Sequence, residues 1–385
     1  MAARALIGLS FAGFIALGMP EGALGVAWPS LASEFERPLG ELGLLLVVYT
    51  SGYLLSTASN GWLMRRFGVG RMLPVSSAIA AATLAVYAGT GRWPVLVSAS
   101  FLLGAAGGLI DAGVNAYTAL RHGSRVMNLL HASFGLGATL GPFVMTFAID
   151  TGSYRTGYGL LAAVQALLAA AFWVSRHRWS IPPPSSEQPG RAGRRPLLAA
   201  SLAVFFLYTG VEVATGQWAF TLLTLDRGID PVPAGLLVTA YWGSFTLGRL
   251  ITAGIGDRRR PEAMVGAGMA AALGGALLLW WSPTDWLGAA GLMITGLSLA
   301  PIFPLLTLLT PGRLGSSYAP TAIGFQLAAA SVGAATLPGL IGLAVNRSGP
   351  GAIGWLLALF AGLLAVSGIV LAAPGRRPVG YGGAS

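Results

Sequence analysis

The sequence predicts an all-α integral membrane protein with twelve transmembrane helices in two pseudo-symmetric six-helix bundles. Three observations predict this class: a composition that is 55% hydrophobic and 9% charged, twelve apolar runs of membrane-spanning length, and a second half that repeats the first. Soluble domains contain about 25% charged residues. The polar surface of this chain is therefore too small to cover a globule in water, and the mean hydropathy of +0.71 agrees.

Twelve segments are long enough to span a membrane, because a helix crosses the hydrocarbon core with about 20 apolar residues. The predicted spans are residues 6–32, 39–64, 71–89, 94–119, 125–149, 155–175, 197–224, 232–256, 262–281, 286–309, 318–345 and 350–373. A polar segment separates six spans from six. We expect an N-terminal bundle over 1–175, a cytoplasmic linker over 176–196 and a C-terminal bundle over 197–385.

The basic residues set the expected orientation. All 23 are arginines, and Arg249 lies within the eighth span. If the N-terminus is cytoplasmic, seventeen others lie on the cytoplasmic side and five on the opposite side: Arg37, Arg92, Arg155, Arg227 and Arg347. Cytoplasmic loops carry an excess of positive charge. The bias predicts a multi-pass cell-membrane protein with both termini in the cytoplasm, and the net charge of +10 requires no nucleic-acid partner.

The second half repeats the first at an offset of about 191 residues. Glu21 and Gly25 in the first span fall on Glu212 and Gly216 in the seventh, and a tryptophan follows each pair within a turn. In the second span, GLLLVVYTSGYLL (43–55) falls on GLLVTAYWGSFTL (235–247). Duplicated halves are a transporter architecture in which the substrate site lies near the membrane midplane, between the halves.

The loop after the second span carries a family signature. GWLMRRFGVGR (61–71) resembles the motif G-x-L-x-D-R-x-G-x-x-R of the major facilitator superfamily, although Arg65 replaces the acid. The second half contains GRLITAGIGDRRR (248–260), which keeps an acid at Asp257. The resemblance implies an alternating-access transporter with these gating-motif residues: Gly61, Arg65, Arg66, Gly68, Arg71, Arg249 and Asp257.

A second resemblance concerns the fourth and fifth spans. Asp111 and Asn115, followed by Arg125, Asn128 and His131, resemble the corresponding region of fucose-permease-like sugar symporters, which has an acid, an Asn four residues later and then R-x-N-L-x-Q. Here Asp replaces Glu, His replaces Gln, and the Arg-to-Asn spacing is one residue longer.

Carboxyl groups within the spans are the expected proton-coupling residues. An ionised carboxylate at the bilayer centre costs roughly 2.5–3.5 kcal/mol on insertion scales, so such a group is neutral when dry and ionised when wet, and can carry a proton. We assign this role to Asp111, Glu21 and Glu212. The alternatives are a structural carboxyl bonded to His131 or an arginine for Asp111, and helix-to-helix hydrogen bonding for Glu21 and Glu212.

Polar and aromatic side chains within the spans are the expected substrate ligands, because sugars bind to ring faces and to amide or carboxylate groups. These residues are Asn115, Asn128, His131, Tyr49, Trp218, Tyr241 and Gln326. Two alternatives remain open: His131 as a partner of Asp111, and the aromatic residues as interfacial anchors. No second His and no Cys accompanies His131, so no metal site is expected.

The predicted function is proton-coupled uptake of a sugar or similar small polyhydroxy solute. The alternative is a drug/proton antiporter, because Gly137-Ala-Thr-Leu-Gly141-Pro142 resembles half of an antiporter motif. Sodium coupling is a further alternative, since carboxylate and amide oxygens also bind sodium. The chain contains no Lys, which excludes a Walker-type ATPase, and no constellation indicates an enzyme. We expect a monomer in the lipid bilayer that uses no cofactor.

Overall fold

The chain is helical throughout the part that its computed structural model describes, residues 2–122, 124–179, 195–255, 260–315 and 317–372. The α-helices of this part are α1 (Ala2–Glu34), α2 (Leu42–Phe67), α3 (Val69–Gly89), α4 (Trp93–Arg121), α5 (Ser124–Thr151), α6 (Tyr154–Ser175), α7 (Arg195–Thr221), α8 (Pro231–Ile255), α9 (Pro261–Trp281), α10 (Asp285–Leu299), α11 (Ile302–Leu314), α12 (Ala319–Ser348) and α13 (Ala352–Ala372). Short turns of other helix types are η1 (Leu39–Glu41), η2 (Arg176–Arg178) and η3 (Leu222–Asp226). Eleven segments of the described residues are long and apolar enough to cross a membrane.

The expected all-helical membrane fold is confirmed, and each predicted span coincides with helix. One span is not a single helix. Residues 286–309 were expected to be continuous, but the structure divides this region into α10 and α11 at Ala300 and Pro301. Proline lacks an amide hydrogen and clashes with the carbonyl four residues earlier. Pro301 removes the donor for the carbonyl of Leu297, and Pro304 removes the donor for the carbonyl of Ala300, so two helical bonds are lost where the helix is interrupted.

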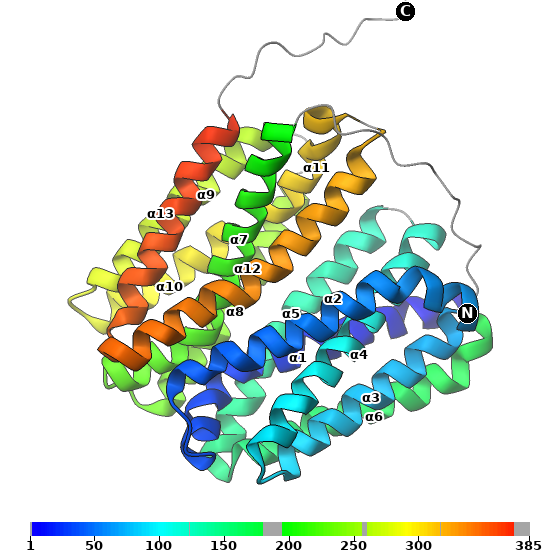
Figure 1. Cartoon of the computed structure of the whole chain (residues 1–385), viewed down its shortest axis with the longest axis horizontal. Helices are drawn as coiled ribbons and strands as arrows, with labels where there is room; N and C mark the ends of the chain where they lie inside the picture. Colours follow the sequence, from blue (N-terminus) through cyan, green and yellow to red (C-terminus); the bar gives the residue numbers. More distant parts are fainter. Residues whose placement is uncertain (1, 123, 180–194, 256–259, 316, 373–385) are drawn as a thin grey trace, which may run out of the picture.

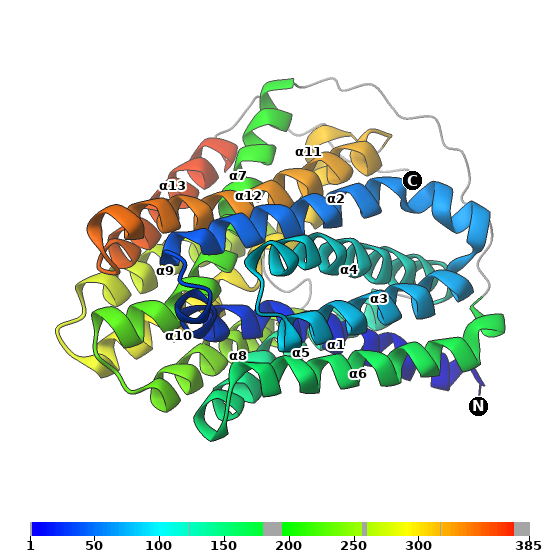
Figure 2. The ribbon, with the colours of Figure 1, turned by 60° about the horizontal axis from the view of Figure 1, so that its bottom comes forward.

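Most of the extensive helix contacts join helices that are not consecutive in sequence (Figures 1 and 2). Helix α1 packs mainly on α5, α2 on α4 and α3 on α6, while α7 packs on α12 and α9 on both α10 and α13. Contacts between the first six helices and the later ones run through α5 and α8, α2 and α12, and α1 and α7. In the contact between α1 and α7, Gly25 of α1 lies so close to α7 that a Cβ at this position would be 2.8 Å from the carbonyl oxygen of Gly216.

Helices α2 and α12 meet through glycine near one end of the molecule. A Cβ at Gly43 would lie 2.7 Å from the Cα atom of Gly339, and the amide of Gly40 donates to Oδ1 of Asn346 at 2.8 Å. Figure 1 shows the two helices converging at this end and diverging toward the other. Small residues allow helix backbones to approach this closely in membranes.

The packing of α1 on α5 also depends on glycine. Cβ atoms at Gly18 and Gly22 would overlap carbonyl oxygens of α5, and Cβ atoms at Gly137 and Gly141 would overlap carbonyl oxygens of α1. Gly22 faces the oxygen of Ala138, whose intrahelical donor is missing because the residue four positions later is a proline. The glycines thus bring the backbone of α1 against a carbonyl that has no amide partner in its own helix.

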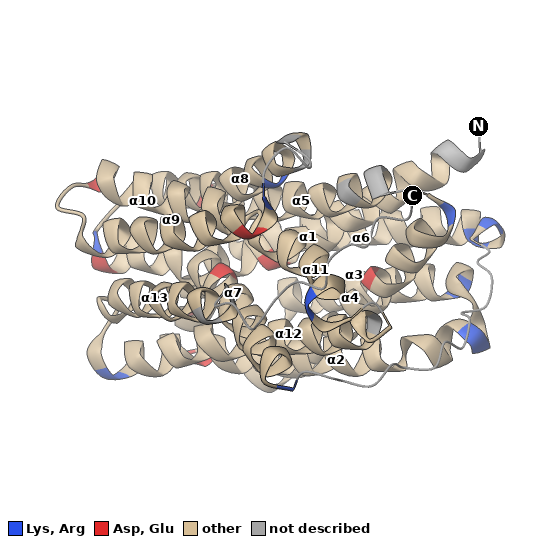
Figure 3. Ribbon diagram, turned by 90° about the horizontal axis from the view of Figure 1, so that it is seen from above, with Lys and Arg blue, Asp and Glu red and all other residues tan. Residues whose placement is uncertain are grey.

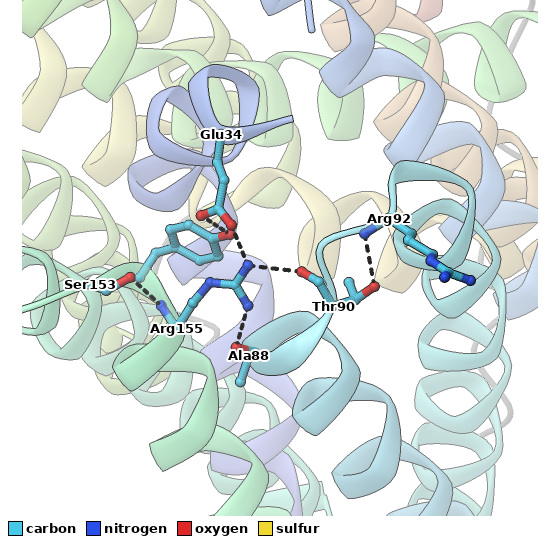
Figure 4. A network of polar contacts seen from close by, with 7 residues as sticks. Glu34, Ala88, Thr90, Arg92, Ser153 and Arg155 are labelled. Carbon is cyan, nitrogen blue, oxygen red and sulfur yellow. Dashed lines mark hydrogen bonds and ion pairs between the residues drawn. The ribbon is translucent and has the colours of Figure 1, made fainter. Parts of the chain in front are cut away.

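Charged side chains hold helix ends together. Figure 3 shows basic positions mostly near helix ends and several acidic positions in the middle of the molecule. Arg155, at the start of α6, forms an ion pair with Glu34 at the end of α1. It also donates to the carbonyl oxygens of Ala88 at 2.8 Å and Thr90 at 3.0 Å, as Figure 4 shows. Three segments therefore meet at one guanidinium.

Arg227 makes a similar set of contacts in the second half. It donates to the carbonyl oxygens of Leu279 at 2.6 Å and Trp280 at 3.1 Å, at the end of α9. Its Nε atom lies 3.6 Å from the carboxylate of Asp226. The last carbonyls of a helix have no intrahelical donors, so each arginine caps the end of one helix, α3 or α9, beside an acid.

The glycine contact between α1 and α5 predicts that a single methyl group destabilises the fold. We expect Gly22→Ala to lower the free energy of unfolding by about 1–3 kcal/mol, the range for overpacking, because the new methyl overlaps the carbonyl of Ala138. Gly8→Ala on the same helix is the control, since nothing lies within 4 Å of a Cβ there. Thermal unfolding in detergent measures both, and equal midpoints for the two variants would contradict the prediction.

Candidate functional site

Asp111 lies on the face of α4 that packs against α2. Glycines permit this contact: a Cβ at Gly104 would overlap the carbonyl oxygen of Tyr49, and a Cβ at Gly108 would lie 2.8 Å from the carbonyl oxygen of Tyr53. Tyr53 donates its hydroxyl to Oδ2 of Asp111 at 2.7 Å, and Asn115 donates its amide to Oδ1 at 2.9 Å. The carboxyl is half-buried and has a partner on each oxygen.

The structural alternative for Asp111 paired its carboxyl with His131 or an arginine, and the structure gives Tyr53 and Asn115 as its hydrogen-bond partners. The Asp111-to-Asn115 spacing of four residues had already placed both on one helix face. The tyrosine could not be paired with Asp111 from sequence, because its place opposite α4 depends on the glycine contacts between the two helices.

A second group of charges lies where α1, α7 and α8 meet. Glu21 interacts electrostatically with Glu212 and Arg249, and more weakly with Asp111. Glu212 is 7% exposed and interacts with the same arginine. Glu21, Glu212 and Arg249 are far apart in sequence but interact electrostatically, and we call these three residues the charged cluster.

Arg249 is the residue whose setting differs most from expectation. It was expected to belong to a gating motif, but the structure places its guanidinium with Glu21 and Glu212, and 4.4 Å from the ring centre of Phe245. Its Nε atom is buried without a hydrogen-bond partner among the described residues. The signal in the sequence was its position inside an apolar span, the only such arginine.

Several other buried polar atoms near α7 lack partners in the described part of the chain. They include Oε1 of Gln217 and the indole nitrogen of Trp242. Gln217 donates its amide to the carbonyl oxygen of Glu21 at 2.8 Å, so it lies directly beside the charged cluster. Buried polar atoms are nearly always hydrogen-bonded, and these atoms offer donors and acceptors to water or a solute.

Three of the expected substrate ligands are enclosed by protein. Trp218 is 0% exposed and donates to the carbonyl oxygen of Pro338 at 3.0 Å. Gln326 is bonded on both sides, to Ser201 at 2.6 Å and Thr310 at 3.1 Å. Tyr241 donates to the carbonyl oxygen of Glu212 at 2.9 Å. Of the three, Tyr241 alone touches a residue of the charged cluster.

The remaining expected ligands lie in the first half. Tyr49 is half-buried on α2, and its hydroxyl lies 3.1 Å from where a Cβ of Gly107 would be. The His131 side chain is exposed on α5, and its ring packs edge-on against Phe14 at 5.8 Å. The side chain of Asn128 lies outside the described residues. Among the described residues, no group of His, Cys, Asp or Glu could hold a metal ion.

The gating-motif residues of the first half connect α2 to α3. Gly68 has φ +75°, which only glycine adopts readily, and its amide donates to the carbonyl of Met64 at 3.0 Å. Arg65 and Arg66 are exposed in the last turn of α2, and Arg71 is exposed on α3. Gly61 lies near Arg65, whose Nη1 would be 3.6 Å from a Cβ at this glycine. Asp257 lies outside the described residues.

The enclosure of Trp218 gives a prediction that separates packing from substrate binding. Trp28, its equivalent in the repeat, is also 0% exposed and donates to the carbonyl of Leu39 at 2.8 Å. We expect Trp218→Phe and Trp28→Phe each to reduce the free energy of unfolding by roughly 1–3 kcal/mol, because each leaves a buried carbonyl without its donor. Substrate affinity should change little. A tenfold loss of affinity in Trp218→Phe alone would restore the binding role.

Comparison with curated proteins finds transporters. The chain is 25% identical over 296 residues to Sodium-dependent glucose transporter 1A of Mus musculus, covering 66% of this chain and 70% of that relative. It is 22% identical over 358 residues to Glucose/mannose transporter GlcP of Bacillus subtilis, covering 89% and 88% of the two chains.

Solved transporters share the fold over nearly the whole chain. The nucleoside transporter NupG matches with a TM-score of 0.73 at 16% identity, covering 97% of this chain and 98% of its own. FucP, solved in an outward conformation, matches with a TM-score of 0.64 at 15% identity and covers 96% and 99%. The sequence of the fourth and fifth spans resembles the fucose-permease-like group, and this chain shares the fold of that group.

A family model decides the classification. The model described as Major Facilitator Superfamily matches residues 9–225, which is 217 of 385 residues and more than half of the chain. The chain belongs to the major facilitator superfamily.

Proposed function

We propose that this chain is a secondary active transporter that takes up a sugar or similar small polyhydroxy solute, driven by protons. The observation that carries the proposal is the placement of three carboxyl groups, Glu21, Asp111 and Glu212, on the inward faces of membrane-spanning helices. Intramembrane carboxyls are costly and mark ion and proton pathways in transporters. The glucose transporters among the relatives support the substrate class.

The proposed architecture is two six-helix bundles, residues 1–175 and 197–385, joined by a cytoplasmic linker over 176–196. Contacts between the first six helices and the later ones are confined largely to three helix pairs, as expected for two bodies that rock against each other. Rocking of this kind around a fixed site gives alternating access.

Proton coupling would depend on the wetting of Asp111. When the site is open to water the carboxyl exchanges protons, and when it is closed and dry the neutral form is the less costly one. Tyr53 and Asn115 hold both oxygens at fixed distances. Substrate would bind while Asp111 carries its proton, and release of the proton on the other side would lower substrate affinity.

The charged cluster would contribute the second half of the site. Arg249 offers a buried guanidinium nitrogen without a partner, and Tyr208 offers a hydroxyl, both beside Glu212. Solute hydroxyls both donate and accept hydrogen bonds, so they can satisfy these atoms together with a carboxylate. Asn115, His131, Tyr49 and Tyr241 remain proposed ligands, while Asn128 and Gln326 are proposed from sequence alone. Trp218 was also proposed from sequence, but the bond from its indole to Pro338 leads us to propose a packing role instead.

The drug/proton antiporter is the second candidate, and its main support is weakened by a specific contact. Gly137 and Gly141 of the antiporter-like segment pack against backbone carbonyls of α1, so helix packing accounts for them. Sodium coupling has support of its own, because the mouse relative is described as sodium-dependent and carboxylates bind sodium as well as protons.

Uptake into proteoliposomes tests the function. With an imposed inward pH gradient, we expect accumulation of at least one member of a panel of radiolabelled sugars, and a sodium gradient alone should not replace it. Accumulation driven by sodium alone would reassign the coupling ion. Transport of lipophilic cations and of no sugar would favour the antiporter.

The variant Asp111→Asn imitates a carboxyl that is always protonated. We expect it to exchange labelled for unlabelled substrate at nearly the normal rate, because exchange needs no net proton release, but to lose accumulation against a gradient by about 100-fold or more. Asp150→Asn at the exposed end of α5 is the control and should behave as wild type. Loss of exchange together with accumulation, in well-folded Asp111→Asn protein, would assign Asp111 to substrate binding or folding.

The arginine bias predicts that both termini and the linker are cytoplasmic. The native chain contains no cysteine, so a single cysteine in place of Ser185 can be labelled without background. We expect a membrane-impermeant maleimide to label it only after the cells are opened. Labelling in intact cells would reverse the orientation.

A further inference from the structure

A proline lies directly before Glu21 on α1, and its effect on the backbone is local. Pro20 has no amide hydrogen, so the carbonyl oxygen of Ala16 loses the donor that helix geometry would provide. In water such a carbonyl would be hydrated. Inside a membrane it must find a partner within the protein.

The partner is the side chain of Gln165 on α6. Its Nε2 atom donates to the carbonyl oxygen of Ala16 at 3.1 Å, across 149 residues of sequence. Gln165 is 3% exposed and lies in a helix that is otherwise apolar around it, in the stretch GLLAAVQALLAAAF. A buried amide in such a setting is costly unless it is hydrogen-bonded, so this one is matched to the carbonyl that Pro20 leaves free.

A small cavity lies at the same place. Its lining includes Ala16, Leu17, Pro20 and Gln165, together with Tyr49 of α2. Its volume is about 10 Å³, at the lower limit for one water molecule. The bond from Gln165 is the polar contact that α1 makes at this cavity.

The backbone around Glu21 is held on its other sides by α5 and α7. The carbonyl oxygen of Glu21 accepts from Gln217 at 2.8 Å, and Gly22 lies against the carbonyl of Ala138. The charged and titratable groups that interact electrostatically with Glu21 are Asp111 on α4, Glu212 on α7, Arg249 and Tyr241 on α8, and Tyr49 and Tyr53 on α2, with His131 on α5 beside Arg249. None of these groups comes from α6.

The repeat supplies an independent comparison within the same chain. At the offset that superposes Glu21 on Glu212, Pro20 falls on Val211, which has an amide hydrogen. The corresponding last helix of the second half, α13, contains neither Gln nor Asn. In the last helix of each half, a side-chain amide is present where the first helix has the proline and absent where it does not.

We propose that Gln165 is a positioning residue for Glu21: it holds the α1 backbone at the carbonyl that Pro20 leaves unpaired, and so fixes where the Glu21 carboxyl lies relative to Glu212 and Arg249. The role of Glu21 in coupling rests on the proposed function. The positioning itself does not, because it is a statement about geometry.

A double-mutant cycle tests the positioning. Gln165→Met keeps an unbranched side chain of similar size and removes the donor. Pro20→Ala returns an amide hydrogen to the helix, so the carbonyl of Ala16 regains its own donor. The measurement is the pH titration of the Glu21 carboxyl by infrared spectroscopy of full-length protein in lipid, with its band identified by its absence in Glu21→Gln.

We expect Gln165→Met to move the titration midpoint of Glu21 by roughly 0.5 pH unit or more, equivalent to about a threefold change in proton affinity. In the Pro20→Ala background the same substitution should have no effect on the midpoint. Leu167→Met, on the exposed face of α6, is the matched control and should leave the midpoint unchanged in both backgrounds.

Two results would overturn the inference. One is an unchanged Glu21 midpoint in folded Gln165→Met protein, even if its thermal stability falls, since that would make Gln165 purely structural. The other is an equal shift with and without Pro20. If the midpoint moves as expected while wild-type uptake shows no pH dependence, the positioning stands and the proposed coupling fails.

Discussion

Backbone carbonyls that have lost their helical donors determine how the centre of this molecule is built. Within a membrane every such oxygen needs a partner from the protein. Pro20 frees the carbonyl of Ala16 and Pro142 frees that of Ala138. Gln165 donates to the first at 3.1 Å, and the backbone of Gly22 packs against the second. Glu21 lies between these two contacts on α1, so the contacts also fix the position of its carboxyl group.

The intramembrane carboxyls divide into two settings with different chemistry. Asp111 is satisfied within the first half by neutral donors on α2 and α4. Glu21 and Glu212 come from different halves, and the charge of Arg249 acts electrostatically on both. Neutral donors leave the charge of a carboxyl free to change without moving a cation, whereas the electrostatic interaction of Arg249 with the two carboxyls depends on the positions of three helices. Relative motion of the halves therefore alters the second setting directly and the first through hydration.

Sequence predicted what depends on composition and local pattern. Hydropathy located the spans, the repeat placed Glu21 and Glu212 in equivalent positions, and the four-residue spacing put Asp111 and Asn115 on one face. The role of Arg249 was missed, because its neighbours come from α1 and α7. Trp218 and Gln326 were expected to face a solute, but their polar atoms are bonded within the protein. Which side of a span faces the centre depends on glycine contacts between helices, and no hydropathy pattern specifies those.

The internal repeat explains why the two halves meet as they do and why they are not interchangeable. Gly25 and Gly216 occupy equivalent positions, and Gly25 packs against the carbonyl oxygen of Gly216, which places Glu21 and Glu212 about one turn away on opposite helices. The residues before the two glutamates are not equivalent, because Pro20 leaves a carbonyl that requires an external donor and Val211 does not. Helix α1 is therefore hydrogen-bonded to α6 at a position where the equivalent carbonyl of α7 has a donor within its own helix. A motion that bends α1 near Glu21 must break or carry along the bond from Gln165 of α6, whereas α7 is attached at Glu212 by Tyr241 of α8, which donates to the carbonyl oxygen of Glu212 at 2.9 Å. The two carboxyls of one cluster therefore respond differently to the same movement, which a pair related by perfect symmetry could not do.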